Sequence, residues 1–214
     1  MADTRSTAEI DLRAWVFIDD LQPGLASFLG SVVMGFYPRP HQVSLFVEVT
    51  PGIAINVLTD IALKNSSVEP GIQYTERYNG LLEIHHDRAA EVHKAGKAIL
   101  AELGMTEADR WPPRILASQL IEDIDSHQAQ PVNRMARGDV LVPGETLLII
   151  EVQPAANALM AANEAEKAVT LRVLDVEGAG SMGRIYMSGR PDEMRNAEAV
   201  ARASLEGFES RPRD

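Results

Sequence analysis

Apolar residues along this chain fall into short runs that are typical of buried strands. Trp15 to Ile18 and Ser44 to Val49 are rich in β-branched and aromatic residues, the composition that strands favour. A further pair of strands is expected around residues 72–74 and 81–84. The spacer between them, Thr75 to Gly80, is polar and ends in glycine, so we predict an exposed turn there.

Other segments show apolar residues at helical spacing. Pro51 stands where a proline opens a helix, and the apolar positions that follow it would give this helix one buried face as far as Lys64. A second helix is predicted to begin after Asp87, a good N-cap, and to stop at Gly104. Strands and helices that alternate in this way predict an α/β fold of the α+β sandwich kind, with helices packed on a sheet.

The same order of elements then occurs a second time. Strands are expected at 146–152, 171–176 and 184–187, and prolines open helices at Pro154 and Pro191. Residues 12–104 align with 115–207 without a gap, at a constant offset of 103. The identical pairs are mostly glycines, prolines and charged residues: Asp20 and Asp123, Gly35 and Gly138, Pro40 and Pro143, Glu48 and Glu151, Pro51 and Pro154, Lys64 and Lys167, Gly80 and Gly183, Gly104 and Gly207.

This repeat predicts two small domains in place of one large one. We place the first at 12–105 and the second at 115–208, joined by a linker at 106–114 that contains Trp111-Pro112-Pro113. Each has about a hundred residues, enough to bury a core. The polar ends, 1–11 and 209–214, are expected to be disordered tails.

Composition excludes several classes of function. A net charge of −11 argues against a protein that binds the phosphates of nucleic acid. The absence of cysteine excludes disulfides, thiolate metal sites and a cysteine nucleophile. No apolar run approaches the roughly 18–20 residues that cross a bilayer, so we expect a cytoplasmic protein without membrane contact.

Candidate chemistry is sparse. His85, His86 and His93 form the one histidine cluster, but neighbours on a strand point to opposite faces, so no metal site is expected. Motifs for nucleotide binding or for a serine nucleophile do not occur, and we expect no cofactor and no catalytic residues. The run around Gly178, Ala179 and Gly180 lacks the lysine of a phosphate loop and is interpreted as a tight turn between strands.

Several stretches nevertheless resemble a known family. They are Phe17-Ile18-Asp19-Asp20-Leu21-Gln22-Pro23, Val49-Thr50-Pro51-Gly52-Ile53, Thr59-Asp60-Ile61-Ala62-Leu63-Lys64, Thr75-Glu76-Arg77, Glu151-Val152-Gln153-Pro154-Ala155 and Met160 to Ala168. In both repeats and in order, they resemble the tandem-domain shell proteins of bacterial microcompartments. The closer resemblance is to the circularly permuted subtype with a gated pore that occurs in carboxysomes.

The resemblance implies a structural protein and no enzyme. Three chains would form a ring of six domains, a pseudohexamer, that tiles with hexameric shell proteins around enclosed enzymes and passes small metabolites. In some relatives two such trimers stack face to face, and the sequence does not decide whether they do so here. Lys64 and Lys167 match the family's lysines at the edge of the tile.

The resemblance also places a gate in the centre of the ring. Glu76 and Arg77, with Tyr78 beside them, match the residues that line and gate the pore, and the small loop Gly178-Ala179-Gly180 lies at the equivalent position of the second repeat. The alternative is a sensor or enzyme on a duplicated α/β domain, in which these same loops form a small-molecule pocket.

Overall fold

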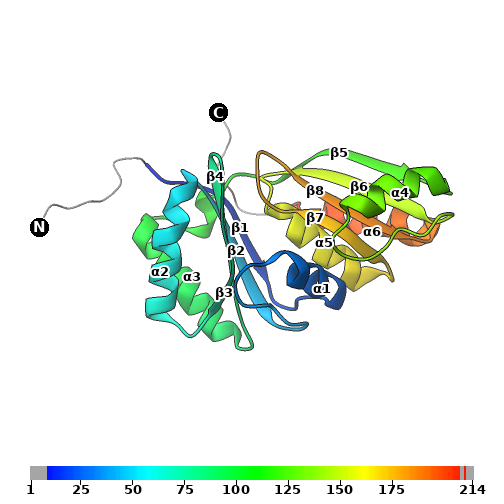
Figure 1. The fold of residues 1–214 in the computed structure, drawn as a ribbon. Helices are drawn as coiled ribbons and strands as arrows, with labels where there is room; N and C mark the ends of the chain where they lie inside the picture. The colour runs from blue at the N-terminus through cyan, green and yellow to red at the C-terminus, as the bar shows by residue number, and fades with distance from the viewer. Residues whose placement is uncertain (1–8, 208–209, 211–214) are drawn as a thin grey trace, which may run out of the picture.

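The computed structural model describes residues 9–207 and 210, and the predicted tails fall mostly outside them. Each repeat folds into a four-stranded sheet with helices (Figure 1). In the first repeat the elements are β1 (Asp11–Ile18), α1 (Pro23–Val32), β2 (Val43–Thr50), the short 3₁₀ helix η1 (Gly52–Ala54), α2 (Ile55–Asn65), β3 (Glu69–Glu76), β4 (Asn79–His86) and α3 (Ala89–Leu103).

The second repeat follows the same order after a linker that holds the short helix η2 (Glu107–Asp109). Its elements are β5 (Arg114–Ile121), α4 (Ser126–Met135), β6 (Thr146–Gln153), α5 (Asn157–Ala168), β7 (Arg172–Glu177), β8 (Gly183–Gly189) and α6 (Pro191–Ser204). The strand orders, β1-β2-β4-β3 and β5-β6-β8-β7, are equivalent. All paired strands are antiparallel, so the fold is of the α+β kind.

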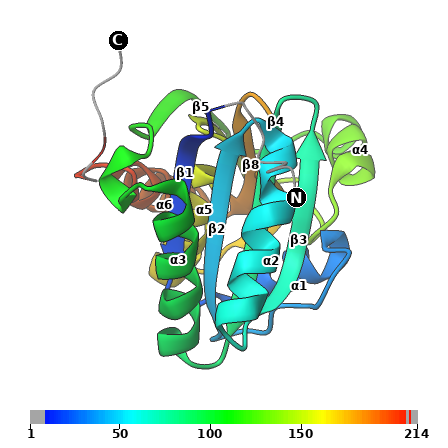
Figure 2. The ribbon, with the colours of Figure 1, turned by 90° about the vertical axis from the view of Figure 1, so that its left-hand side faces the viewer.

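Three strands of the first sheet, β1, β2 and β4, are buried on both faces, whereas β3 at its edge is largely exposed. One face packs on α2 and α3, which lie side by side in front of it (Figure 2), through residues such as Trp15, Leu45 and Leu82. The opposite face contributes Val16 and Phe46 to a core that continues into the second repeat. Because this core crosses from one repeat to the other, the two repeats share a core and form one packed body.

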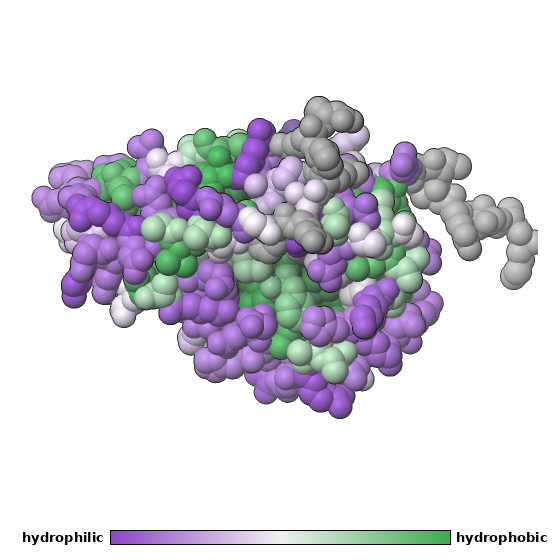
Figure 3. Space-filling view, turned by 180° about the vertical axis from the view of Figure 1, so that it is seen from behind, coloured by the Kyte–Doolittle hydropathy of each residue, from purple (hydrophilic) through white to green (hydrophobic). Residues whose placement is uncertain are grey.

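The second sheet is covered less completely. Helices α5 and α6 pack on one face of it, and part of the opposite, outer face is covered by Ala129 of α4 and by Leu141 in the loop after α4. Seen from behind, apolar residues reach the surface in the middle of the molecule and near its upper edge, surrounded by hydrophilic ones (Figure 3). Within the described residues, no helix is long and apolar enough to cross a membrane.

Several expectations need correction. Helices α1 and α4 and strand β5 were not predicted. Asp87 does not cap α3: its carboxylate accepts hydrogen bonds from Gln42 and Arg39, and Arg88 is the N-cap. The exposed turn is shorter than predicted, since Asn79 and Gly80 are buried at the start of β4. Strand β1 begins at Asp11, inside the segment predicted as a tail.

Candidate functional site

The turn between β3 and β4 carries the predicted gate residues. Arg77 adopts a positive φ of 42°, unusual for a residue with a side chain, and its side chain is 93% exposed. Its Nε lies 3.9 Å from Oε1 of Glu76, a loose ion pair. Tyr78 is exposed beside them. The tip of the hairpin therefore presents two charges and a phenol to the solvent.

The base of this hairpin is held firmly. The N–H of Gly52 donates to the carbonyl of Tyr78 at 2.8 Å, and the hydroxyl of Thr75 donates to the carbonyl of Gly52 at 3.3 Å. A Cβ on Gly80 would lie 2.3 Å from the carbonyl oxygen of Gly52, so only glycine allows this approach. These contacts hold the base of the hairpin against η1.

The structure brings the equivalent loop of the second repeat next to this hairpin. The side-chain amide of Asn79 donates to the carbonyl of Gly180 at 2.8 Å, while its oxygen accepts from the hydroxyl of Thr50 at 2.6 Å. Gly180 has a φ of 115°, and a Cβ there would come 3.9 Å from the carboxylate of Glu76. The charged tip and the small loop thus form one feature, with Asn79 as the link.

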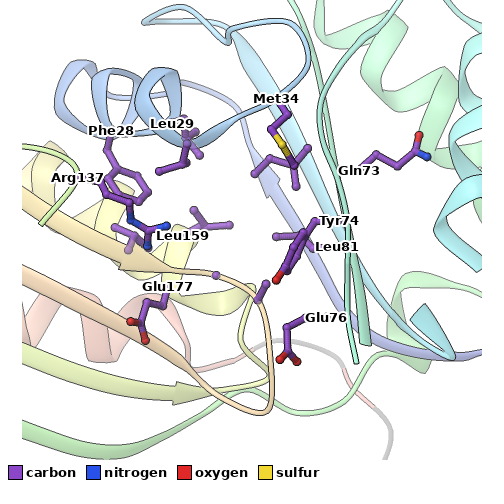
Figure 4. Close-up of a pocket in the computed structure, with 15 residues that line it drawn as sticks. Phe28, Leu29, Met34, Gln73, Tyr74, Glu76, Leu81, Arg137, Leu159 and Glu177 are labelled. Atoms are coloured by element: carbon purple, nitrogen blue, oxygen red, sulfur yellow. The ribbon is translucent and has the colours of Figure 1, made fainter. Parts of the chain in front are cut away.

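A cavity of about 360 Å³ opens between the repeats beside these loops (Figure 4). Leu29 of α1, Tyr74 and Glu76 of β3, and Leu159 of α5 line it. Arg137 stands over the ring of Phe28 at 5.7 Å and donates to the buried carboxylate of Asp175 at 2.8 Å. The cavity is mostly apolar, with charges at its margins.

A buried glutamate joins the two repeats deeper in the core. Glu48 of β2 pairs with Arg13 at 2.7 Å and accepts the backbone N–H of Ala156, before α5, at 3.0 Å. Burial raises the pKa of the Glu48 carboxyl, while the charge of Arg13 and the N–H of Ala156 oppose this rise. This carboxylate thereby connects the start of α5 to the first sheet.

The far end of α5 makes another polar contact between the repeats. The carboxylate of Glu166 accepts the N–H groups of Gly24 and Leu25 at 2.6 and 2.9 Å, and Asn163 accepts the N–H of Gln22. These groups lie at the N-terminus of α1, where a helix leaves its own N–H groups unsatisfied. A residue about 140 positions away along the sequence therefore caps α1.

The two predicted edge lysines occupy different surroundings. Lys64 is exposed and pairs with Asp60 on its own helix at 2.6 Å. Lys167 is partly covered and pairs with Glu164 at 2.9 Å and with Asp19 of the first repeat at 3.1 Å. Their role at the edge of a tile stays a prediction.

The histidines do not gather at one point. His85 is buried with Nδ1 at 3.1 Å from Glu83, His86 accepts the N–H of Arg88, and His93 stacks on Phe17 at 4.4 Å between ring centroids. Among the described residues, no three acidic or histidine side chains could hold a metal ion together.

Comparison with known proteins decides the family. A model of the CsoS1D N-terminal domain matches residues 12–109. The carboxysome shell protein CcmP of Synechococcus elongatus is 46% identical over 94% of this chain and 95% of its own length. The chain belongs to this family of carboxysome shell proteins. The shell protein CsoS1D of Hydrogenovibrio crunogenus is 39% identical over 92% of the chain and 96% of that protein.

Solved structures of this shell protein family agree in fold. The fused permuted hexameric shell protein MSM0275 of the RMM microcompartment superposes with a TM-score of 0.89 at 40% identity, over 92% of this chain and 99% of that one. The double-ringed trimeric shell protein MSM0271 of the same compartment gives 0.90 at 37% identity, over 94% and 98%. The permuted tandem fold implied by the resemblance is thereby confirmed.

Sequence reasoning missed the residues that join the repeats of this shell protein. The sequence did contain a signal for Glu48: a glutamate stands inside an apolar strand at the equivalent position of both repeats, Glu48 in the first and Glu151 in the second. Asn79 and Glu166 have no such counterpart. Their partners lie 101 and about 140 residues away, beyond the reach of any local pattern.

Proposed function

We propose that three copies of this chain close into a ring of six repeats that serves as a structural tile in the shell of a bacterial microcompartment. The observation that carries the proposal is the agreement of both repeats, over nearly their whole length, with shell proteins whose structures are named hexameric or trimeric. Within the chain, α5 of the second repeat packs on the first sheet, and a contact of this kind between two different surfaces closes into a ring when the rotation permits.

In such a ring the hairpin tips would gather around the central axis. Charged tips with Glu76 and Arg77 would then alternate with the small loops at Gly178 to Gly180. Pairing of Glu76 with Arg77 of a neighbouring copy closes the hole by charge-assisted hydrogen bonds, and swinging the tips outward opens it. The small loops leave room for this swing.

Replacement of both Glu76 and Arg77 by alanine tests the pore. We expect the pore to stay open, so that a bulky metabolite crosses assembled shells faster, while the trimer is as stable as before. The matched control removes another exposed ion pair, Arg190 with Asp192, which lies at the start of α6 away from the hairpins. Equal flux through shells of wild type and of the first variant would place the gate elsewhere.

The partners proposed for the tile are hexameric shell proteins at its edge and small metabolites in its pore. A second trimer stacked on the first is a further candidate, since one relative is named double-ringed. We assign the chain no reaction. The described residues that line the cavity include no Ser, Thr, Cys, His or Lys that could act as a nucleophile beside a base.

The cavity between the repeats favours one alternative, a small-molecule sensor. Its volume of about 360 Å³ and its apolar lining suit a metabolite. A sensor does not require the ring, whereas a tile does. Thermal shift with metabolites on a chain that stays monomeric would therefore favour the sensor.

A further inference from the structure

Asn79 at the start of β4 makes two hydrogen bonds that fix the orientation of its amide. Its side chain is buried, its oxygen accepts from the hydroxyl of Thr50 at 2.6 Å, and its NH2 group donates to the carbonyl of Gly180 at 2.8 Å. A rotated amide would turn its oxygen toward the carbonyl of Gly180, and two acceptors cannot bond to each other. Only one orientation of Asn79 therefore links Thr50 to Gly180.

The second repeat lacks the residues for an equivalent link. At the constant offset of 103, Gln153 stands for Thr50 and Met182 stands for Asn79. Gln153 donates to the carbonyl of Ser181 at 3.0 Å, within its own repeat. A methionine has no amide that could donate to the other repeat. The link therefore runs only from the charged hairpin of the first repeat to the small loop of the second.

The small loop at Gly178 to Gly180 is held at both of its ends. A Cβ on Gly178 would lie 2.9 Å from Cδ1 of Leu159, so the backbone packs closely on α5 at this point. Gly180 has a φ of 115°, which side chains rarely permit, and its carbonyl is held by Asn79. Loss of the Asn79 amide would therefore release one end of the loop and leave the other in place.

Glu76 lies beside the end of the loop that Asn79 holds. A Cβ on Gly180 would come 3.9 Å from Oε2 of Glu76, and Figure 4 shows this carboxylate next to the turn between β7 and β8. The side chain of Glu76 is 37% exposed, whereas that of Arg77 is 93% exposed. The two residues of the hairpin tip therefore differ, since Glu76 lies against its own chain and Arg77 extends into the solvent.

We infer that Asn79 is a positioning residue of the gate. By holding the carbonyl of Gly180, it keeps the small loop where it supports Glu76 in a retracted position, away from Arg77 of a neighbouring copy. The repeats do not need this bond to stay together, because the contacts of α5 already join them. This role of Asn79 rests on the proposed ring and gate, and it sets the balance between the open and closed forms of the pore.

Spin labels would measure the positions of the hairpin tips in the ring. The chain has no cysteine, so Tyr78→Cys introduces a single labelling site at an exposed residue of the tip and leaves Glu76 and Arg77 in place. Distances between the labels of one trimer separate gathered tips from retracted ones. In Asn79→Leu we expect the population with gathered tips to rise roughly two- to tenfold, the change in an equilibrium that the loss of one hydrogen bond produces.

Two further variants isolate the bond to Gly180. Asn79→Asp keeps the oxygen that accepts from Thr50 and loses only the donor, so it should give the same rise. Thr50→Val is the matched control, because it removes the hydroxyl but keeps the bond from Asn79 to Gly180. It should lower the unfolding midpoint as Asn79→Leu does and leave the label distances unchanged. Equal changes of distance in Thr50→Val and Asn79→Leu would show a merely structural role.

The flux of a bulky metabolite through assembled shells gives a second readout. Asn79→Leu should lower this flux, because more of the tips pair across the pore. With Glu76→Ala present, Asn79→Leu should have no further effect on flux or on label distances, since Asn79 acts through Glu76. An effect of Asn79→Leu that persists without the carboxylate would contradict this role.

The outcomes separate the role of Asn79 from the gate itself. Label distances that change with Glu76→Ala but not with Asn79→Leu leave the gate standing and show that Asn79 does not position it. Distances that change with neither variant overturn the proposed gate, and a wild-type chain that stays monomeric overturns the proposed ring. In both of these cases the role of Asn79 is overturned as well.

Discussion

Glu83 and His85 form a polar pair inside the first sheet. The carboxylate of Glu83 lies 3.1 Å from Nδ1 of His85 and accepts the N–H of Gly71. Burial raises the pKa of Glu83 above its ordinary value of 4.5, against the opposing effect of His85. The ionised form of this group is therefore less favourable in the folded chain than in the unfolded one.

This raised pKa predicts a pH dependence of stability. The folded chain holds the proton at pH values where the unfolded chain has lost it, so the stabilisation is complete below pH 4.5 and is lost as the pH rises through the raised pKa. Each unit of pKa difference is worth about 1.4 kcal/mol. Glu83→Gln should remove this part of the pH dependence in urea unfolding.

The control for this measurement is Glu69→Gln. Glu69 lies 3.6 Å from Nε2 of the same His85, but its side chain is exposed. Its substitution should leave the pH dependence close to that of the wild type. Identical pH profiles for wild type and Glu83→Gln would contradict the account of the buried pair.

At the scale of elements, the strands and the longer helices follow from local pattern, whereas α1 and α4 do not. Gly24 and Gly30 in α1, and Pro131 inside α4, are poor helix formers. Helix α1 depends on capping by Glu166, which lies in the other repeat. Local propensity therefore underestimates a helix that tertiary contacts stabilise.

Glu166→Ala should accordingly destabilise the folded chain. The variant leaves the N–H groups of Gly24 and Leu25 without their carboxylate, and the loss of such a cap costs about 1–2 kcal/mol of unfolding free energy. Chemical denaturation measures it. Glu164→Ala, on the same helix, removes a carboxylate that does not cap α1, and we expect a loss below about 0.5 kcal/mol. Equal losses in the two variants would show that the cap does not stabilise α1.

For the candidate site, the sequence predicted where the hairpin tips lie but not what holds them. The resemblance located Glu76, Arg77 and the loop at Gly178 to Gly180. The link through Asn79 was missed because Asn79 falls in a stretch that was interpreted as exposed turn. A buried asparagine whose partner lies on the other repeat has no signature in local hydrophobic pattern.

On the scale of the whole molecule, the ungapped repeat predicted two equivalent folds, and the structure has them. What the repeat could not show is how the halves are joined, because Glu48, Asn163 and Glu166 act across more than a hundred residues. The halves also differ at equivalent positions, for example at Leu63 in the first and Glu166 in the second. Such differences can be interpreted only when those contacts are known.

The edge of the tile is best tested at Lys64. Lys64→Asp should leave the trimer intact, because an exposed ion pair contributes less than about 1 kcal/mol, but it should abolish extended sheets with hexameric shell proteins by electron microscopy. Lys167→Asp does not separate the tile edge from the fold as clearly, because it would place a third negative charge beside Asp19 and Glu164 between the repeats. Loss of the trimer in Lys64→Asp would place this lysine inside the ring.

The central claim is that this chain supplies two of the six repeats in a closed ring. Native mass spectrometry at micromolar concentration tests it most directly. The account predicts one dominant species at three times the chain mass of 23.4 kDa, or at six times if two rings stack. A chain that persists as a monomer under these conditions would contradict it.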